Sequence, residues 1–218
     1  MTCCCAARIK YRGEYLTVVG ADSEVSDSSG RLNDLLGDGK LYRFHDAVVA
    51  INGMGPMTEA LLELQENHTY MKSLRFTTKR MVRKFVSKFF GEMRGLIEEA
   101  VITPDILQQI GILLVVTPGH VYSGWNDLSI FEHGRFYTTG AGADKSAGAM
   151  EVLYDALEKV IDDLEPEQAW EAFEDIVHRS ISASCKTTFG VGEPICIERV
   201  VPMELPPAPK RGRKKKVK

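Results

Sequence analysis

The sequence lacks the long hydrophobic segment and the leader that would send a chain to or across a membrane. Its longest aliphatic run, from Ile110 to Val116, is much shorter than the ~20 residues that a membrane-spanning helix needs. The N-terminus has no basic region followed by a hydrophobic stretch, so it does not read as a secretory signal. We therefore expect a cytoplasmic protein without membrane contact.

Metal-binding and disulfide patterns are missing as well. The five histidines are scattered, and neither C-x-x-C nor H-x-x-x-H spacing occurs. The five cysteines, three of them adjacent at Cys3, Cys4 and Cys5, suit a reducing compartment better than a disulfide framework. There is no G-x-x-x-x-G-K-[ST] nucleotide motif. We expect no metal and no cofactor, and we interpret the cysteines as small buried hydrophobic residues.

The charge is distributed unevenly, although the net charge of the 218 residues is only −3. The last nine residues, KRGRKKKVK, hold seven Lys and Arg and no acid, so residues 1–209 carry 20 basic and 30 acidic groups. The segment PMELPPAP precedes this basic end and is typical of a linker. We therefore predict a globular domain over residues 2–201 and a disordered basic tail over residues 202–218.

Hydrophobic periodicity gives the order of the elements. Residues 3–11 and 15–22 are short apolar runs around a turn at Gly13, and residues 40–53 resemble a second hairpin that turns near His45 and Asp46. The polar segment 23–39 between them is expected to be a loop. Period 3.6 predicts helices from Pro56, over 78–100, over 144–164 and over 165–182. Three strand-like runs, GILLVVTP, HVYSGW with DLSIFEH, and GRFYTTG, separate the helix pairs, and a last strand covers 195–201.

The order strands, two helices, strands, two helices, strand favours an α+β fold in which two sheets are stacked and covered by helices, a four-layer αββα sandwich. In such a stack, a strand that starts at residue 3 is buried on both faces. That would explain why the chain begins with the apolar run CCCAA.

Thr2 is the first residue with possible chemistry. If Met1 is removed, as is usual before a small residue, Thr2 carries both a hydroxyl and a free α-amine. A hydroxyl needs a neighbouring base to become a good nucleophile, and an α-amine with an ordinary pKa of about 7.7 to 8.0 can be that base. One residue could then serve as nucleophile and base together.

A terminal threonine on an apolar strand, a second strand ending in GAD, the stretch GKLYRFHD, the turn NGMG and the later TTGAGADKSAGAMEVLYDAL together resemble the N-terminal nucleophile hydrolases. Among these the sequence is most similar to proteasome β-subunits and the HslV-type peptidase, over about residues 2–201. The resemblance implies a threonine endopeptidase in a homo-oligomeric ring that encloses peptide or unfolded-protein substrates. It also implies a separate ATPase unfoldase as partner.

The resemblance assigns roles to individual residues. Thr2 matches the nucleophile, Lys40 the lysine whose charge would lower the pKa of the α-amine, and Asp22 the carboxylate that orients this lysine. Gly53 matches the glycine whose N–H stabilises the oxyanion. Ile51 is expected to line the pocket for the substrate side chain before the cleaved bond.

Two positions depart from the family pattern. Ala141 in TTGAG stands where a serine is usual, and an alanine side chain cannot form a hydrogen bond. An Asp and a Ser that proteasome members carry before the last strand are also absent, so Thr187 or Thr188 would have to substitute for them. These departures leave two alternatives open: an Ntn-fold assembly or DNA-associated protein with little or no activity, and an Ntn amidase that acts on a small molecule.

The basic tail has its own set of interpretations. Its KRGRKK core resembles the Arg-Gly-Arg element of AT-hooks, which suggests contact of Arg211 and Arg213 with a narrow minor groove, and it also resembles nuclear-import signals. A solvated tail without a partner, a nucleic-acid contact and a protein or targeting contact all remain open.

Overall fold

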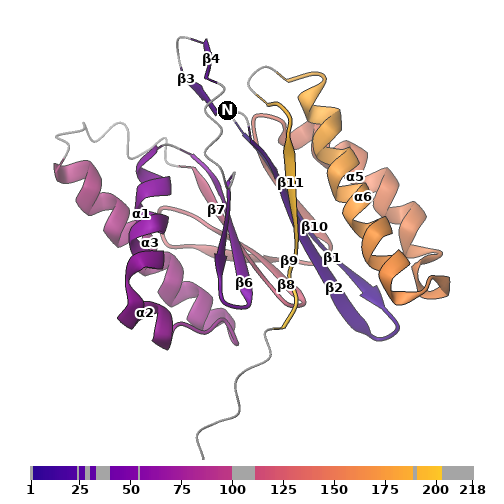
Figure 1. The fold of residues 1–218 in the computed structure, drawn as a ribbon, viewed down its shortest axis with the longest axis horizontal. Coiled ribbons are helices and arrows are strands. Elements are labelled where there is room, and N and C mark those ends of the chain that lie inside the picture. The colour runs from indigo at the N-terminus through magenta and orange to yellow at the C-terminus, as the bar shows by residue number, and fades with distance from the viewer. Residues whose placement is uncertain are drawn as a thin grey trace, which may run out of the picture.

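The structure, a computed structural model, describes residues 2–23, 25–27, 30–32, 40–53, 55–99, 111–188 and 191–202. Within these ranges the chain forms two stacked antiparallel sheets with helices on both outer faces (Figure 1). The predicted αββα sandwich of the α+β class is confirmed. Arg211 and Arg213 of the basic tail lie outside the described residues. None of the described helices is long and apolar enough to cross a membrane.

The first sheet has the strand order β10-β1-β2-β11 and contains the chain start. Strands β1 (Cys3–Tyr11) and β2 (Glu14–Asp22) form a hairpin whose two turn residues, Arg12 and Gly13, have φ angles of 46° and 94°. Two positive φ angles in a two-residue turn match the right-handed twist of the flanking strands. Strand β10 (Phe136–Gly140) pairs with β1, and β11 (Ile195–Arg199) pairs with β2.

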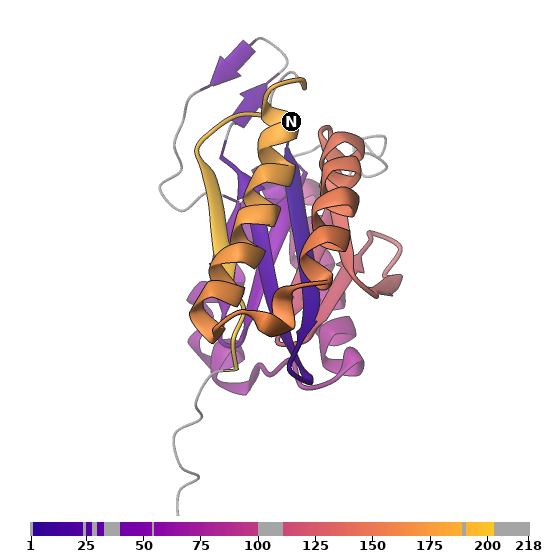
Figure 2. The ribbon, with the colours of Figure 1, turned by 90° about the vertical axis from the view of Figure 1, so that its right-hand side faces the viewer.

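The second sheet is a five-stranded antiparallel meander. Its strands are β5 (Leu41–Phe44), β6 (Ala47–Asn52), β7 (Ile112–Thr117), β8 (His120–Gly124) and β9 (Ile130–His133), paired in chain order. Its outer face is covered by α1 (Gly55–Glu66), α2 (His68–Ser73) and α3 (Lys79–Glu99). On the other side of the molecule, α5 (Ala143–Glu158) and α6 (Pro166–Cys185), joined through the 3-10 turn η1 (Ile161–Asp163), cover the first sheet (Figure 2).

Strand β1 lies between two apolar layers, as the sequence predicted. One face of the strand packs against α5 and α6 through Cys3, Cys5, Ala7 and Ile9. The other face packs against the second sheet through Cys4 and Ala6, and all six side chains are fully buried. Because helices press on one face and a sheet on the other, small apolar side chains fit along the whole strand. This packing holds the start of the chain in place from residue 2 onward.

Some local predictions were wrong. Part of the segment 23–39, expected as a loop, forms the hairpin β3 (Val25–Asp27) and β4 (Gly30–Leu32). Apart from Ser23, the other residues of this segment lie outside the described residues. Helix α2 was missed; its N-cap Asn67 accepts a hydrogen bond from the Tyr70 N–H at 2.9 Å. The run 120–133, expected as one strand, is the β8–β9 hairpin, and the helix expected to reach residue 164 ends at Glu158.

Candidate active site

The hairpin of β1 and β2 brings the start of the chain to the carboxylate of Asp22. Because the strands are antiparallel, the first residue of β1 lies beside the last residue of β2. The backbone N–H of Cys3 donates a hydrogen bond of 2.8 Å to Asp22 Oδ1. Thr2, the residue before Cys3, is only 6% exposed. The predicted carboxylate is therefore bonded to the peptide N–H that directly follows the predicted nucleophile.

Lys40 contacts the same carboxylate oxygen. Its Nζ lies 2.8 Å from Asp22 Oδ1, and the side chains of Lys40 and Asp22 are 12% and 0% exposed. The N–H of Gly192, in the segment after α6, donates to Asp22 Oδ2 at 3.3 Å. Asp22 thus joins three parts of the chain: the N-terminus, the residue before β5 and the segment before β11.

The environment of Asp22 is electrostatically costly. Burial raises the pKa of Asp22, and the charge and hydrogen bond of Lys40, followed by the N–H groups of Cys3 and Gly192, oppose this rise. Removing two charges from water can cost more free energy than their attraction returns. A buried pair of this kind is therefore poorly explained by stability alone, and it fixes a cation next to the start of the chain.

Gly140 allows the close approach of β10 to Thr2. Its φ of 104° lies in the region that side chains other than glycine rarely adopt, and a Cβ on it would lie 1.9 Å from the Thr2 carbonyl oxygen. No side chain can occupy that space without moving one of the two backbones. The glycine is therefore required for Thr2 to keep its present position.

Gly53 follows β6 at the same end of the sandwich. Its neighbour Asn52 donates from Nδ2 to Thr139 Oγ1 at 3.1 Å, and Thr139 precedes Gly140 on β10. This hydrogen bond connects the second sheet, which carries Gly53, to the first sheet, which carries Thr2. It links the predicted oxyanion donor and the predicted nucleophile across the two sheets.

Ile51 has a different environment from the other predicted site residues. Its side chain is 5% exposed and packs in the core between the second sheet and its helices, in the same cluster as Met57. Its backbone is close to the site, since its N–H donates to the Lys40 carbonyl at 3.4 Å and its carbonyl accepts from Cys4 Sγ at 3.5 Å. The role of its side chain in a substrate pocket stays a prediction.

The two positions that depart from the family pattern lie around the start of α5 and the end of α6. Ala141 is exposed in the turn between β10 and α5. The Thr187 hydroxyl, in the turn after α6, donates to the Ala183 carbonyl in the last turn of that helix at 2.9 Å. Ser184 makes the connection between these segments: its hydroxyl donates to the Gly142 carbonyl at 2.7 Å and lies 3.6 Å from Cys3 Sγ.

Sequence reasoning named Thr2, Asp22, Lys40 and Gly53 as candidates but did not name the residues that connect them. Asn52 and Thr139 carried no signal beyond their place next to noted glycines. Gly140 was noted only as part of TTGAG, and Gly192 and Ser184 act through contacts that a linear pattern does not reveal. Among the described residues, no three His, Cys, Asp or Glu side chains are grouped to hold a metal ion.

Comparison with known proteins identifies the fold. No protein-family model matches the sequence, and no curated protein matches it. Among solved structures, BPH of Thiobacillus denitrificans superposes with a TM-score of 0.65 at 18% identity over 91% of this chain and 99% of that one. HslV of Trypanosoma brucei gives 0.57 at 15% identity over 90% and 98%, and Anbu (ancestral beta-subunit) of Yersinia bercovieri gives 0.61 at 12% over 91% and 81%. The chain therefore has the fold of the proteasome β-like N-terminal nucleophile hydrolases.

Proposed function

We propose that this protein is a threonine endopeptidase subunit of a self-compartmentalised, ring-shaped homo-oligomer, with Thr2 as the N-terminal nucleophile after removal of Met1. The observation that carries the proposal is the buried Asp22–Lys40 pair, with Asp22 bonded to the N–H of Cys3 directly after Thr2. A chain that needed only a stable sandwich would gain little from two charges at this place.

The proposed reaction divides the work among four residues. Thr2 Oγ attacks the carbonyl carbon of the peptide bond, and its proton passes to the Thr2 α-amine. The Gly53 N–H donates to the oxyanion, while Lys40, held by Asp22, stabilises the negative charge that develops near Thr2. The tetrahedral intermediate then expels the amine of the peptide, which takes the proton from the α-ammonium. Water hydrolyses the remaining ester and regenerates Thr2.

The comparisons support a peptide substrate. One of the structurally similar proteins, BPH of Thiobacillus denitrificans, has been solved in complex with Epoxomicin, at a TM-score of 0.60 and 19% identity over 91% of this chain. A ring and a separate unfoldase partner follow only from the family resemblance, and so does confinement of unfolded proteins. Contact of Arg211 and Arg213 with nucleic acid stays a prediction from the tail sequence.

Ala141 supports a second candidate function. An exposed methyl group in the turn before α5 replaces a hydroxyl near the proposed nucleophile, which favours an Ntn-fold subunit of low or no activity that serves in assembly. Ala141→Ser distinguishes the two: an increase in peptide hydrolysis would show that the missing hydroxyl limits an active enzyme. A small-molecule amidase is favoured instead if a dipeptide amide is cleaved and longer peptides are not.

The proposal is tested by the hydrolysis of fluorogenic tetrapeptides. Thr2→Val keeps the shape of the side chain and removes its hydroxyl, and we expect a fall in kcat of at least ~100-fold. Thr77→Val is the matched control, because Thr77 is exposed in the segment before α3 and is not one of the candidate site residues. Equal activity of Thr2→Val and the wild type would rule out the threonine mechanism.

A further inference from the structure

The outer surface of α3 carries a concentration of positive charge. Between Glu66 and Glu92 the sequence has seven Lys and Arg and no acid, although residues 1–209 as a whole carry ten more acidic than basic groups. Arg80, Arg83 and Lys84 are exposed and form no salt bridge with any residue that the structure describes. Together with Ser87 and Lys88 they surround a shallow hollow of ≈ 690 Å³.

This arrangement works against the stability of the helix. Cations near the first turn oppose the helix dipole, and α3 has no acid in its first turn. Lys84 follows Arg80 at i+4, and Lys88 follows Lys84 at i+4, so like charges are neighbours on one face. Among the side chains that the structure describes, Lys88 alone forms an ion pair within the helix, with Glu92 at 2.5 Å.

Two glycines continue the same face. Gly91 and Gly95 follow Ser87 at intervals of four residues, and a Cβ added at either would meet no atom within 4 Å. Glycine is costly inside a helix, and here packing within the chain does not require it. Without a Cβ, however, another backbone can approach the helix closely. Sequences break local rules of this kind most often at functional surfaces.

We propose that the exposed face of α3, defined by Arg80, Arg83, Lys84, Ser87, Gly91 and Gly95 and here called the α3 face, is a docking surface for an acidic helix of a separate protein chain. Arg80, Arg83 and Lys84 would bind the carboxylates of the partner helix. Ser87, Gly91 and Gly95, here called the Ser87–Gly95 stripe, would allow the backbone of that helix to approach α3 closely. The proposal does not depend on the peptidase reaction.

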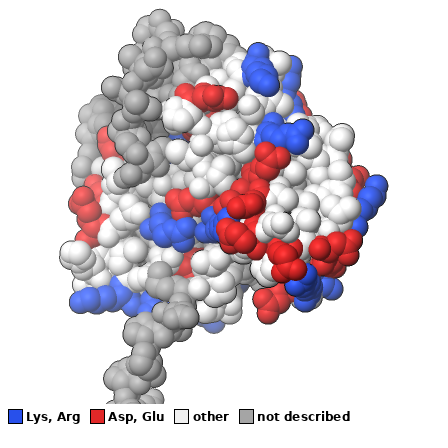
Figure 3. All heavy atoms as spheres, turned by 45° about the vertical axis from the view of Figure 1, so that its right-hand side comes forward, with Lys and Arg blue, Asp and Glu red and all other residues white. Residues whose placement is uncertain are grey.

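The chain's own acidic surface is a less suitable partner. Asp and Glu gather on α5 and α6, which come forward in Figure 3, so a second copy would offer complementary charge. However, this layer and α3 lie on opposite outer faces of the sandwich (Figure 1). Contact between opposite faces is a head-to-tail contact, which leaves one α3 face and one acidic face uncovered at the ends of every open assembly.

Nucleic acid is also less suitable. A duplex that extended beyond α3 would meet a body whose acidic groups outnumber the basic ones by ten over residues 1–209. The residues that line the hollow include no aromatic side chain on which a base could stack. A local acidic helix fits the limited size of the patch better.

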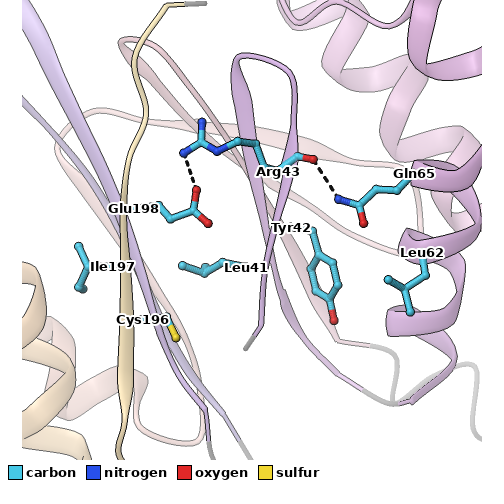
Figure 4. Close-up of a pocket in the computed structure, with 8 residues that line it drawn as sticks. All are labelled: Leu41, Tyr42, Arg43, Leu62, Gln65, Cys196, Ile197 and Glu198. Atoms are coloured by element: carbon cyan, nitrogen blue, oxygen red, sulfur yellow. Dashed lines mark hydrogen bonds and ion pairs between the residues drawn. The ribbon is translucent and has the colours of Figure 1, made fainter. Parts of the chain in front are cut away.

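A second groove, between the sheet edges β5 and β11, is partly closed from within. Arg43 bridges the two edges by bonding Glu198 Oε2 at 2.5 Å, and Gln65 donates to the Arg43 carbonyl at 2.9 Å (Figure 4). These contacts protect the edges, and nothing there indicates an occupant. The α3 face has no comparable cover in the described structure.

The test measures binding of a fluorescein-labelled, 20-residue helical peptide, with Glu along one face and Ala along the next, to the full chain by anisotropy. The triple variant Arg80→Glu, Arg83→Glu, Lys84→Glu should weaken binding at least tenfold. Its matched control, Lys145→Glu, Lys159→Glu, Arg179→Glu on α5 and α6, makes the same charge change and should weaken binding less than twofold. Both variants keep the basic tail, so equal losses would overturn the proposal.

Gly91→Leu separates docking from simple charge attraction. It fills the stripe without changing charge, and we expect at least fivefold weaker binding, whereas Gly148→Leu, on α5 and equally open, should have no effect. Circular dichroism and Tm verify folding, and Arg83→Glu alone replaces any triple variant that fails to fold. If Gly91→Leu left binding unchanged, the proposed close contact at the Ser87–Gly95 stripe would be wrong. Tighter binding of a 20-base-pair DNA duplex, lost in the α3 triple variant, would identify a nucleic-acid surface instead.

Discussion

The Asp22–Lys40 pair and the ion pairs of Arg199 use the same chemistry in opposite environments. Asp22 is fully buried and Lys40 is 12% exposed, whereas Arg199 and its partners Glu174 and Glu167 are 30%, 29% and 68% exposed. Arg199 makes more ionic contacts, at 2.6 Å to Glu174 and 2.7 Å to Glu167, and also lies over the ring of Trp170. The number of contacts therefore does not indicate which pair matters more.

Solvent decides the difference. Water screens the Arg199 pairs, so their charges cost little to form and contribute little when made. The Asp22–Lys40 pair is largely shielded from water, so each charge is stabilised mainly by the other. Removal of one side chain leaves an uncompensated charge in the interior. The comparison predicts large and coupled effects at Asp22 and Lys40 and small, salt-dependent effects at Arg199.

The largest effect is expected at the buried pair. Lys40→Met and Asp22→Asn should each lower the free energy of unfolding by about 3 to 5 kcal/mol, because the remaining charge stays buried without its partner. The double variant should be more stable than Lys40→Met alone. Urea unfolding measures all three, and activity should be lost in each. Additive destabilisation in the double variant would mean that the two side chains do not depend on each other.

Gly140→Ala should have the next largest effect. Its Cβ would lie 1.9 Å from the Thr2 carbonyl oxygen, at a φ of 104°. We expect a loss of about 2 to 4 kcal/mol in the free energy of unfolding and a fall in kcat, because β10 and the start of the chain must move apart. Gly134→Ala, where no atom lies within 4 Å, is the control and should be close to neutral. Comparable losses in both variants would contradict the assigned role of Gly140.

Arg199→Gln should change stability much less than either variant above. It removes the contacts to Glu174 and Glu167, and we expect a loss of about 1 kcal/mol or less that shrinks further in 0.5 M salt. Thermal unfolding at low and high salt measures the difference. A loss as large as that of Asp22→Asn, or one that salt does not reduce, would remove the contrast between buried and exposed pairs.

The smallest effect concerns pH. Burial holds the pKa of His133 below its ordinary value of 6.5; its Nε2 lies 2.9 Å from Ser123 Oγ, and its ring stacks on Tyr137. As the pH falls, His133 is therefore protonated in the unfolded chain before it is protonated in the folded protein. The stability that neutral, buried His133 contributes is present above about pH 6.5 and is lost below it. His133→Gln should reduce the drop in Tm between pH 7.5 and 5.5 by about 2 °C or less. The exposed His178→Gln is the control, and a reduction of the same size there would contradict this account.

Sequence reasoning reached the layers of the fold because the hydrophobic pattern reports burial directly. The stripe from Val82 to Ile97 on α3 and the doubly buried start CCCAA are examples, and both are packed as expected. The short hairpin β3–β4 and helix α2 were missed because a few polar residues carry no clear period. Their structure depends on turn geometry and capping, such as the Asn67 cap.

The candidate site was predicted only as far as residue types and order allowed. The family resemblance placed Asp22 beside Lys40, and the structure has the two side chains in contact at 2.8 Å. The Asn52–Thr139 and Ser184–Gly142 hydrogen bonds join residues 87 and 42 positions apart, and no spacing rule relates such pairs. Contacts of this kind become visible only in three dimensions.

The central claim is that Thr2 is the mature N-terminus and the nucleophile, and one mass-spectrometric experiment tests it. The intact mass of the purified protein should lack Met1, and treatment with a peptide epoxyketone should add one inhibitor, which fragmentation places on Thr2. Cys3 should remain unmodified, because its side chain is fully buried and burial raises the pKa of its thiol. Retention of Met1, or an adduct on Cys3 in place of Thr2, would contradict the account.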